Sequence, residues 1–284
     1  MLGRTRRPAV SVPGIELRPI GDIGPQTDWT GHLDGVECVI HLANRAHRPA
    51  RPMDGTDEAE AAAALARAAG SAGVRRLVHF SSIRAMGDRT APGAPFRCTE
   101  RPRPRDPYGR GKLATEHALQ AAARQTGIEF VILRPPLVYG PGVKGNFRWL
   151  LRLAGSGLPL PFAGVGNRRS LLFIDNLVDL AALASVHAAA SGGVLLARDA
   201  ADWSTPDLLR ALAAGLDRPL RLFALPQPAF AAFRRVPGVG GLVERLTLSL
   251  QVDDAETRAA LGWLPPVSSE MGLIATARAF RERS

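Results

Sequence analysis

Tyr108 and Lys112 are the two residues whose types and spacing best suit acid–base chemistry. They lie four positions apart, and residues at that spacing share one face of a helix. A free tyrosine has a pKa of about 10 and is a poor base at neutral pH, but a neighbouring ammonium favours the phenolate. The pair is therefore a candidate general acid–base. Taken alone, the same pattern also fits a solvated tyrosine and lysine on a helix surface.

Two other segments give the pair a context. Ser82 ends a predicted buried strand, where a hydroxyl often projects toward a ligand; its alternative role is a cap or turn. Residues 133–142 (LRPPLVYGPG) follow another buried strand and form a rigid turn, whose alternative role is a structural crossover. Together with the tyrosine and lysine, these segments favour the chemical interpretation.

The elements that must position these residues follow from capping signals and apolar runs. Asp106 and Pro107 predict the start of a helix, and Gly127 predicts its end. An Ala-rich helix begins near Thr56 and ends between residues 70 and 73. The segments that read as strands are residues 16–23, 36–43, 75–82 and 129–134. The second of these is nearly continuous in apolar residues, as in a sheet covered on both faces.

Strands that alternate with helices predict an α/β fold with a doubly wound parallel sheet, similar to a Rossmann fold. Beyond Pro135 the pattern becomes mostly helical, and it predicts a smaller C-terminal lobe. There Asn146 is expected to cap a helix, and further helices start near Thr205 and Ser268. We therefore expect a dinucleotide-binding domain over residues 1–142. A mainly substrate-binding lobe over 143–284 would return some segments to the sheet.

Composition narrows the class of protein. The 284 residues are 46% hydrophobic and 22% charged, as in a globular protein. The sequence has no apolar run of membrane-spanning length and no signal-like start. The net charge of +10 would suit a protein that binds nucleic acid, but the arginines are scattered and form no basic recognition face. Only two of the 36 basic residues are lysines, Lys112 and Lys144. Cys38 and Cys98 suit neither a metal site nor a disulfide, which favours the cytoplasm.

In order and spacing, the sequence resembles the extended short-chain dehydrogenases/reductases, in the NAD-dependent epimerase/dehydratase branch that acts on nucleotide sugars. The segments that carry the resemblance are GDIG (21–24), VIHLA (39–43), FSS (80–82), DPYGRGK (106–112), RPPLVYGPG (134–142), RRSLLFIDNLVD (168–179) and LGW (261–263). They extend over nearly the whole chain from Gly3 onward.

The resemblance implies roles for individual residues. Tyr108 would be the acid–base at the sugar C4 oxygen, Ser82 would hydrogen-bond the same oxygen, and Lys112 would hold the nicotinamide ribose. The residues implied in binding NAD or NADP are Asp22, Ile23, Leu42, Ala43, Pro135, Tyr108 and Lys112. Those implied in binding a UDP-sugar are Ser82, Asn146, Arg169 and Arg245, the last three at the diphosphate. A homodimer through the helix that bears Tyr108 is implied by the same analogy.

One part of the family pattern is not found. The resemblance implies an opening strand and a Gly-x-x-Gly-x-x-Gly turn that receives the cofactor pyrophosphate. Here residues 3–8 (GRTRRP) instead resemble the end of the second strand, and residues 45–60 lack the family's Asn before the next helix. We therefore expect a sheet without its first strand and glycine turn, and weakened cofactor binding. A truncated or misassigned start, a degraded gene, and a protein without a firmly held dinucleotide remain the three explanations.

The residues after Ser82 narrow the reaction. The dehydratases of the family have an Asp-Glu pair there, whereas this chain has Ile83 and Arg84, so 4,6-dehydration is not expected. What remains is 4-epimerisation or 4-keto reduction of a nucleotide sugar in surface-polysaccharide synthesis. Arg6 and Arg7 would meet an NADP 2′-phosphate or be plain surface residues, which leaves NAD and NADP open. The alternative function is a non-catalytic module that binds nucleotide sugars or protein without a cofactor.

Overall fold

The computed structural model describes residues 2–3, 13–16, 18–43, 56–91, 93–233, 235 and 240–283. Arg6 and Arg7 lie outside these residues. The chain divides into two compact units. The first unit comprises Met1–Met86, Pro102–Leu133 and Ser185–Val194, and the second comprises Gly87–Arg101, Arg134–Ala184 and Leu195–Ser284. The assignment of residues 1–142 to the cofactor and 143–284 to the substrate stays a prediction.

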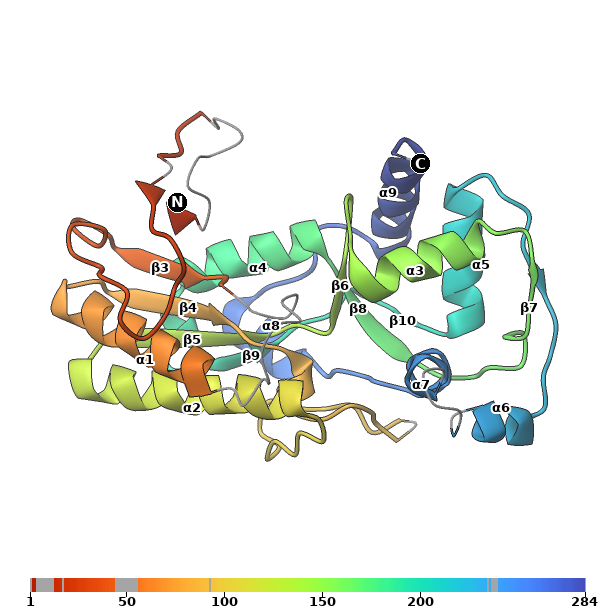
Figure 1. The fold of residues 1–284 in the computed structure, drawn as a ribbon, viewed down its shortest axis with the longest axis horizontal. Coiled ribbons are helices and arrows are strands. Elements are labelled where there is room, and N and C mark those ends of the chain that lie inside the picture. The colour runs from red at the N-terminus through yellow and green to blue at the C-terminus, as the bar shows by residue number, and fades with distance from the viewer. Residues whose placement is uncertain are drawn as a thin grey trace. The chain divides into compact units, whose positions relative to one another are not determined.

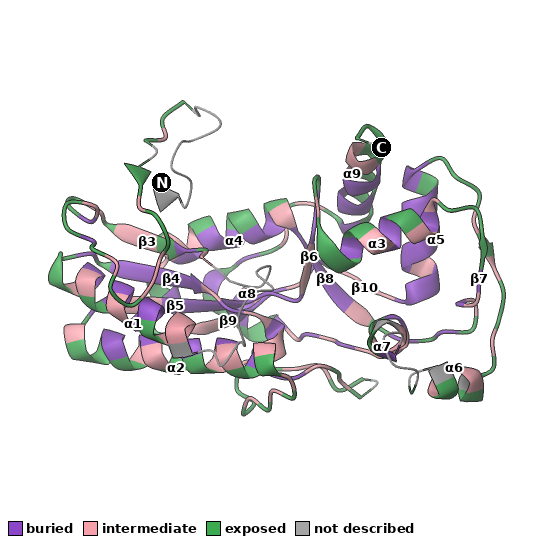
Figure 2. Ribbon diagram, viewed as in Figure 1, coloured by how far each residue is buried: buried purple, intermediate pink, exposed green. Residues whose placement is uncertain are grey.

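The first unit contains β3, β4 and nearly all of β5, which belong to a four-stranded sheet in the order β3-β4-β5-β9. Its strands are β3 (Cys38–His41), β4 (Arg76–Phe80), β5 (Glu129–Arg134) and β9 (Val194–Leu196). β3 pairs with β4 in parallel, and β4 pairs with β5 in parallel. The predicted parallel α/β architecture is confirmed, and the predicted strand 129–134 coincides with β5. Most of β4 and β5 is buried, as expected for strands inside a covered sheet (Figure 2).

β3 departs from the prediction of a strand covered on both faces. Within the described residues it is the edge strand, hydrogen-bonded to β4 alone. Ile40 is 44% exposed, and Leu42, just beyond the strand, is 59% exposed. The apolar run therefore predicted the strand correctly but its burial wrongly, because cover depends on neighbouring elements that the run does not encode.

Two long helices pack side by side in the first unit, α1 (Thr56–Ser71) and α2 (Pro107–Thr126) (Figure 1). The two helices share a hydrophobic core with β4. This core contains Ala66 and Ala69 of α1, Leu77 of β4 and Leu119 of α2. A separate parallel pair is formed by β1 (Leu2–Gly3) and β2 (Arg18–Pro19). β2 is much shorter than the predicted strand 16–23. Pro19 cannot donate a ladder hydrogen bond, and Gly21 turns the chain with a φ of 74°, a value that glycine adopts without strain.

The second unit is built from helices around short strands. Its sheets are β10 (Asp202–Trp203), β8 (Arg169–Phe173) and β6 (Leu137–Tyr139) in that order, and β11 (Arg221–Leu222) with β7 (Pro159–Leu160). Its helices are α3 (Gly145–Ala154), α4 (Ile174–Val186), α5 (Thr205–Gly215), α6 (Gln227–Phe233), α7 (Gly240–Thr247), α8 (Ala255–Leu261) and α9 (Ser269–Arg281). None of the described helices is long and apolar enough to cross a membrane.

A buried hydrogen-bond network fixes the core of the second unit. The Tyr139 hydroxyl donates to Asp199 Oδ2 at 2.7 Å. Asp199 Oδ1 accepts from the Phe173 backbone N–H at 3.0 Å and from Asn176 Nδ2 at 2.8 Å. Asp199 is fully buried, and burial raises the pKa of its carboxyl. Burial, followed by the charge of Asp199, also raises the pKa of Tyr139, so the phenol remains a donor. The tyrosine of the predicted rigid turn is thus part of the core.

Candidate active site

The start of α2 carries the predicted acid–base pair. Asp106 caps the helix by accepting a hydrogen bond from the Gly109 backbone N–H at 2.6 Å. The helix ends at Gly127, which has a left-handed φ of 76°. Both predicted ends are confirmed. Tyr108 is half-buried and Lys112 is buried. The Lys112 ammonium lies 5.9 Å from the centre of the Tyr108 ring, so the two groups share one face of the helix.

Lys112 has a partner that the sequence did not indicate. Its Nζ lies 2.6 Å from Glu58 Oε1 on the neighbouring helix α1. The lysine side chain is 1% exposed and the glutamate side chain 16% exposed, so this is a largely buried ion pair. The spacing of residues along the chain carries no signal for it, because it depends on how α1 packs against α2. Glu58 lies in the stretch where the family's pattern was not recognisable.

The turn that carries Ser82 is held against the start of α2. Ser82 caps the short 3₁₀ helix η1 (Ile83–Ala85), and its Oγ accepts from the Arg84 backbone N–H at 3.2 Å. The Arg84 guanidinium forms an ion pair with Asp106. A Cβ atom added at Gly109 would lie closer to the Arg84 carbonyl oxygen than any side chain allows. The serine turn and the tyrosine helix therefore form one tightly packed piece.

Two histidines lie near the same ion pair, at the carboxyl ends of β3 and β4. His41 and His79 are register partners, and their Nδ1 atoms are 3.0 Å apart, so one must donate to the other. Burial, followed by the positive charge of Lys112, lowers the pKa of His41 to about 4. Burial, then the charges of His41 and Lys112, lowers the pKa of His79 as well. Both rings are therefore neutral at neutral pH, a feature that strand register determines and that no motif predicted.

The residues predicted to bind the cofactor occupy different surroundings. Asp22 is exposed after β2, and Ile23 is half-buried against the core of the first unit. Leu42 and Ala43 follow β3, the leucine exposed and the alanine half-buried. Pro135 is buried directly after β5. In parallel α/β sheets, ligands bind beyond the carboxyl ends of the strands. Leu42, Ala43 and Pro135 each lie just beyond such an end.

In the second unit the structure brings together two of the three predicted diphosphate ligands. Arg245 Nη1, from α7, donates to Asn146 Oδ1 at 3.0 Å, and both residues are exposed. Arg169 Nη1 instead donates to the Leu248 carbonyl oxygen at 3.1 Å. The prediction that Asn146 caps α3 is wrong. The helix starts two residues earlier than that cap would imply: its cap residue is Lys144, and its first residue is Gly145, which has a left-handed φ of 63°.

Comparison of this chain with known proteins identifies its family. The model of the NAD dependent epimerase/dehydratase family matches residues 15–196. A UDP-glucose 4-epimerase of Vibrio cholerae is 40% identical over 281 residues, which cover 96% of this chain and 86% of that protein.

Solved structures agree on the fold. The UDP-glucuronic acid 4-epimerase of Bacillus cereus, in complex with NAD, superposes with a TM-score of 0.73 at 20% identity, over 94% of this chain and 81% of that one. RMD of Pseudomonas aeruginosa, complexed with NADPH, gives 0.71 at 21% identity, over 97% and 92%. The family model matches well over half of the chain, and the Vibrio protein aligns with nearly all of it. The predicted resemblance is confirmed: this chain belongs to the NAD-dependent epimerase/dehydratase family.

Proposed function

We propose that this protein is a nucleotide-sugar 4-epimerase that acts on a UDP-sugar, with Tyr108 as its proton-transfer group. The observation that carries the proposal is the half-buried phenol of Tyr108, which shares one helix face with the Lys112 ammonium. The start of that helix packs against the turn of Ser82 at Gly109. The extent of the similarity to the Vibrio UDP-glucose 4-epimerase supports the choice of substrate and reaction.

The residues around α2 and at the ends of β3 and β5 suit a nicotinamide dinucleotide. An ammonium has three donors, and the contact with Glu58 uses one, which leaves donors of Lys112 for ribose hydroxyls. The exposed leucine after β3 offers an apolar contact at the carboxyl edge of the sheet. We assign cofactor binding to Asp22, Ile23, Leu42, Ala43, Pro135, Tyr108 and Lys112. The bound cofactor would accept the hydride from the sugar C4 and later return it.

The chain's own residues supply the proton chemistry. Tyr108 takes the proton of the C4 hydroxyl as the alcohol becomes a ketone, and returns it when the ketone is reduced from the opposite face. Ser82 donates a hydrogen bond to the same oxygen and holds it beside the phenol. Dehydration has no support at this site, since Ile83 is buried and Arg84 is engaged by Asp106.

Asn146, Arg169 and Arg245 of the second unit are proposed to bind the substrate diphosphate. The forked donors of arginine suit two phosphates in succession. The hydrogen bond between Arg245 and Asn146 holds one guanidinium in a fixed position. Substitution of Arg245 by Gln should therefore raise the KM for the UDP-sugar more than it lowers kcat.

The test is interconversion of UDP-glucose and UDP-galactose by the purified protein with added NAD, followed by chromatography. Tyr108→Phe should lower kcat about 10²–10⁴-fold, the range for loss of a general acid–base. Tyr139→Phe is the matched control, because the chain has only these two tyrosines and the second is part of the core. Equal activity of Tyr108→Phe and wild type would overturn the assignment.

The same assay separates the remaining alternatives. A 4-keto reductase would consume NADPH stoichiometrically with a UDP-4-keto-6-deoxy sugar, whereas an epimerase shows no net cofactor turnover. Calorimetric binding of UDP-sugar by wild-type protein that binds neither NAD nor NADP would contradict the enzymatic proposal and favour a binding module. Whichever sugar is turned over will then test the proposed role in surface-polysaccharide synthesis.

A further inference from the structure

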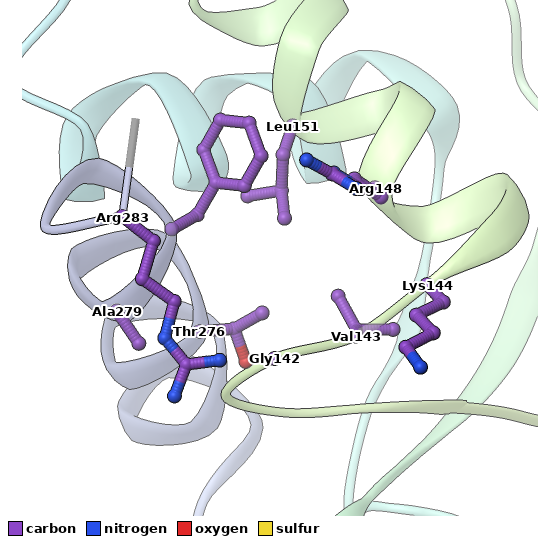
Figure 3. Close-up of a pocket in the computed structure, with 9 residues that line it drawn as sticks. Gly142, Val143, Lys144, Arg148, Leu151, Thr276, Ala279 and Arg283 are labelled. Carbon is purple, nitrogen blue, oxygen red and sulfur yellow. The ribbon is translucent and has the colours of Figure 1, made fainter.

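The second unit contains a cavity of about 210 Å³ between the start of α3 and the end of α9 (Figure 3). Lys144 and Arg148 line it from the α3 side, and Arg283 lines it from the residues after α9. Leu151 and Phe280 provide an apolar wall. The cavity is thus small, partly apolar and rimmed by three cations.

The positive charge of this cavity is not compensated within the described part of the chain. None of its lining residues is acidic, and none of its three cations forms an ion pair with a described residue. Nearby arginines behave differently, since Arg210 pairs with Asp207 and Arg281 pairs with Asp217. Three like charges around one space are unfavourable unless an anion joins them.

Two local features add to the site. The backbone N–H groups at the start of α3 carry the positive end of the helix dipole, and Lys144 at the cap position supplies no capping hydrogen bond. Gly142 has a φ of 78°, and a Cβ atom there would lie 2.9 Å from Arg283 Nη1. The absence of a side chain at this turn therefore leaves room for the guanidinium, and Figure 3 shows Arg283 reaching toward Gly142.

The cavity is distinct from the proposed diphosphate contact of Asn146. Lys144, Arg148 and Leu151 follow the i, i+4, i+7 spacing of one helix face. Asn146, two positions before Arg148, falls about 200° from it around the helix and is hydrogen-bonded to Arg245 on α7. α3 thus presents a cationic cavity on one face and the proposed substrate contact on the other. The chain has two lysines, Lys112 and Lys144, and Lys144 lines this cavity.

We propose that this cavity is a second anion site, which binds a compact phosphate-bearing anion of about the size of pyrophosphate. Cavities for whole drug-sized ligands have volumes of about 300–1,000 Å³, so this one suits a phosphate group or two rather than a complete nucleotide sugar. Three basic side chains beside a helix N-terminus match the acceptors of a diphosphate. The inference does not depend on the proposed epimerase activity.

The test is calorimetric titration of the full chain with inorganic pyrophosphate at low ionic strength. The double variant Lys144→Gln/Arg148→Gln should bind at least about tenfold more weakly, the effect of losing one charge-assisted contact or more. Arg283→Gln should weaken binding by a similar factor. Arg152→Gln is the matched control, because it removes the same charge from exposed α3 surface that does not line the cavity. It should bind within about twofold of wild type.

Two results would overturn the proposal. One is a double variant that binds pyrophosphate as tightly as Arg152→Gln, which would make the attraction a general effect of net charge. The other is loss of UDP binding in the double variant in parallel with pyrophosphate, which would make the cavity part of the nucleotide site. A double variant that retains UDP binding but loses pyrophosphate supports two separate sites. Thermal unfolding of each variant checks that the fold is retained.

Discussion

Replacement of Glu58 by Gln tests the buried ion pair that anchors Lys112. The change keeps the size of the side chain but removes the charge that faces an ammonium 2.6 Å away. Removing one partner of a buried pair typically costs about 3–5 kcal/mol, because the other charge is left uncompensated. Glu58 is 16% exposed, so water partly replaces the lost carboxylate, and we expect about 3 kcal/mol from the low end of that range.

Urea unfolding followed by circular dichroism measures this free energy. Glu60→Gln is the control, since Glu60 lies on the same helix but is exposed, and it should change stability by no more than about 0.5 kcal/mol. Lys112→Met and the double variant complete a thermodynamic cycle, in which the loss from Glu58→Gln should shrink once the ammonium is gone. Equal stability of Glu58→Gln and Glu60→Gln would refute the buried pair.

Three further changes test other parts of the structure. Gly109→Ala should destabilise the protein by about 1–3 kcal/mol, because the new methyl group overpacks the contact between helix and serine turn. It should lower kcat as well, and unaltered unfolding and turnover would contradict this contact. His41 has a folded pKa of about 4 and an unfolded value near 6.5, so unfolded chains bind more protons between these pH values. The free energy of unfolding should therefore fall as pH drops below 6.5, by about 1.4 kcal/mol per unit for each of His41 and His79, and a His41→Gln/His79→Gln variant should show a flatter pH profile in urea titrations. Tyr139→Phe should cost about 1–3 kcal/mol in thermal or urea unfolding, because Asp199 loses a buried donor, yet leave turnover per folded molecule unchanged.

The elements that local chemistry specifies were predictable. Asp106, Pro107 and Gly127 give both ends of α2, since each residue acts on the backbone within a turn of its own position. The continuous apolar run of β5 likewise predicted its bounds. α9 starts beside Ser268 as expected, and the structure adds that Ser268 caps it, with its side chain accepting from the Met271 backbone N–H.

What the sequence did not predict depends on contacts between distant segments. Glu58 meets Lys112 because two helices pack together, and His41 meets His79 because two strands pair in one register. The start of α3 was predicted two residues too late, since the helix begins at Gly145, whose φ is positive, and already includes Asn146. The family motifs therefore place Tyr108 on its helix, while the charges that surround it had to come from the structure.

The contact between Gly109 and the Arg84 carbonyl has a consequence for how this enzyme family member can diversify. Since position 109 has room for hydrogen alone, the hydroxyl of Ser82 and the phenol of Tyr108 are borne on parts that cannot slide past each other. Random mutagenesis with selection for new sugars should therefore leave this junction untouched. Accepted changes should accumulate instead among residues that contact the sugar and the nucleotide, so one unchanging proton-transfer centre would serve many substrates.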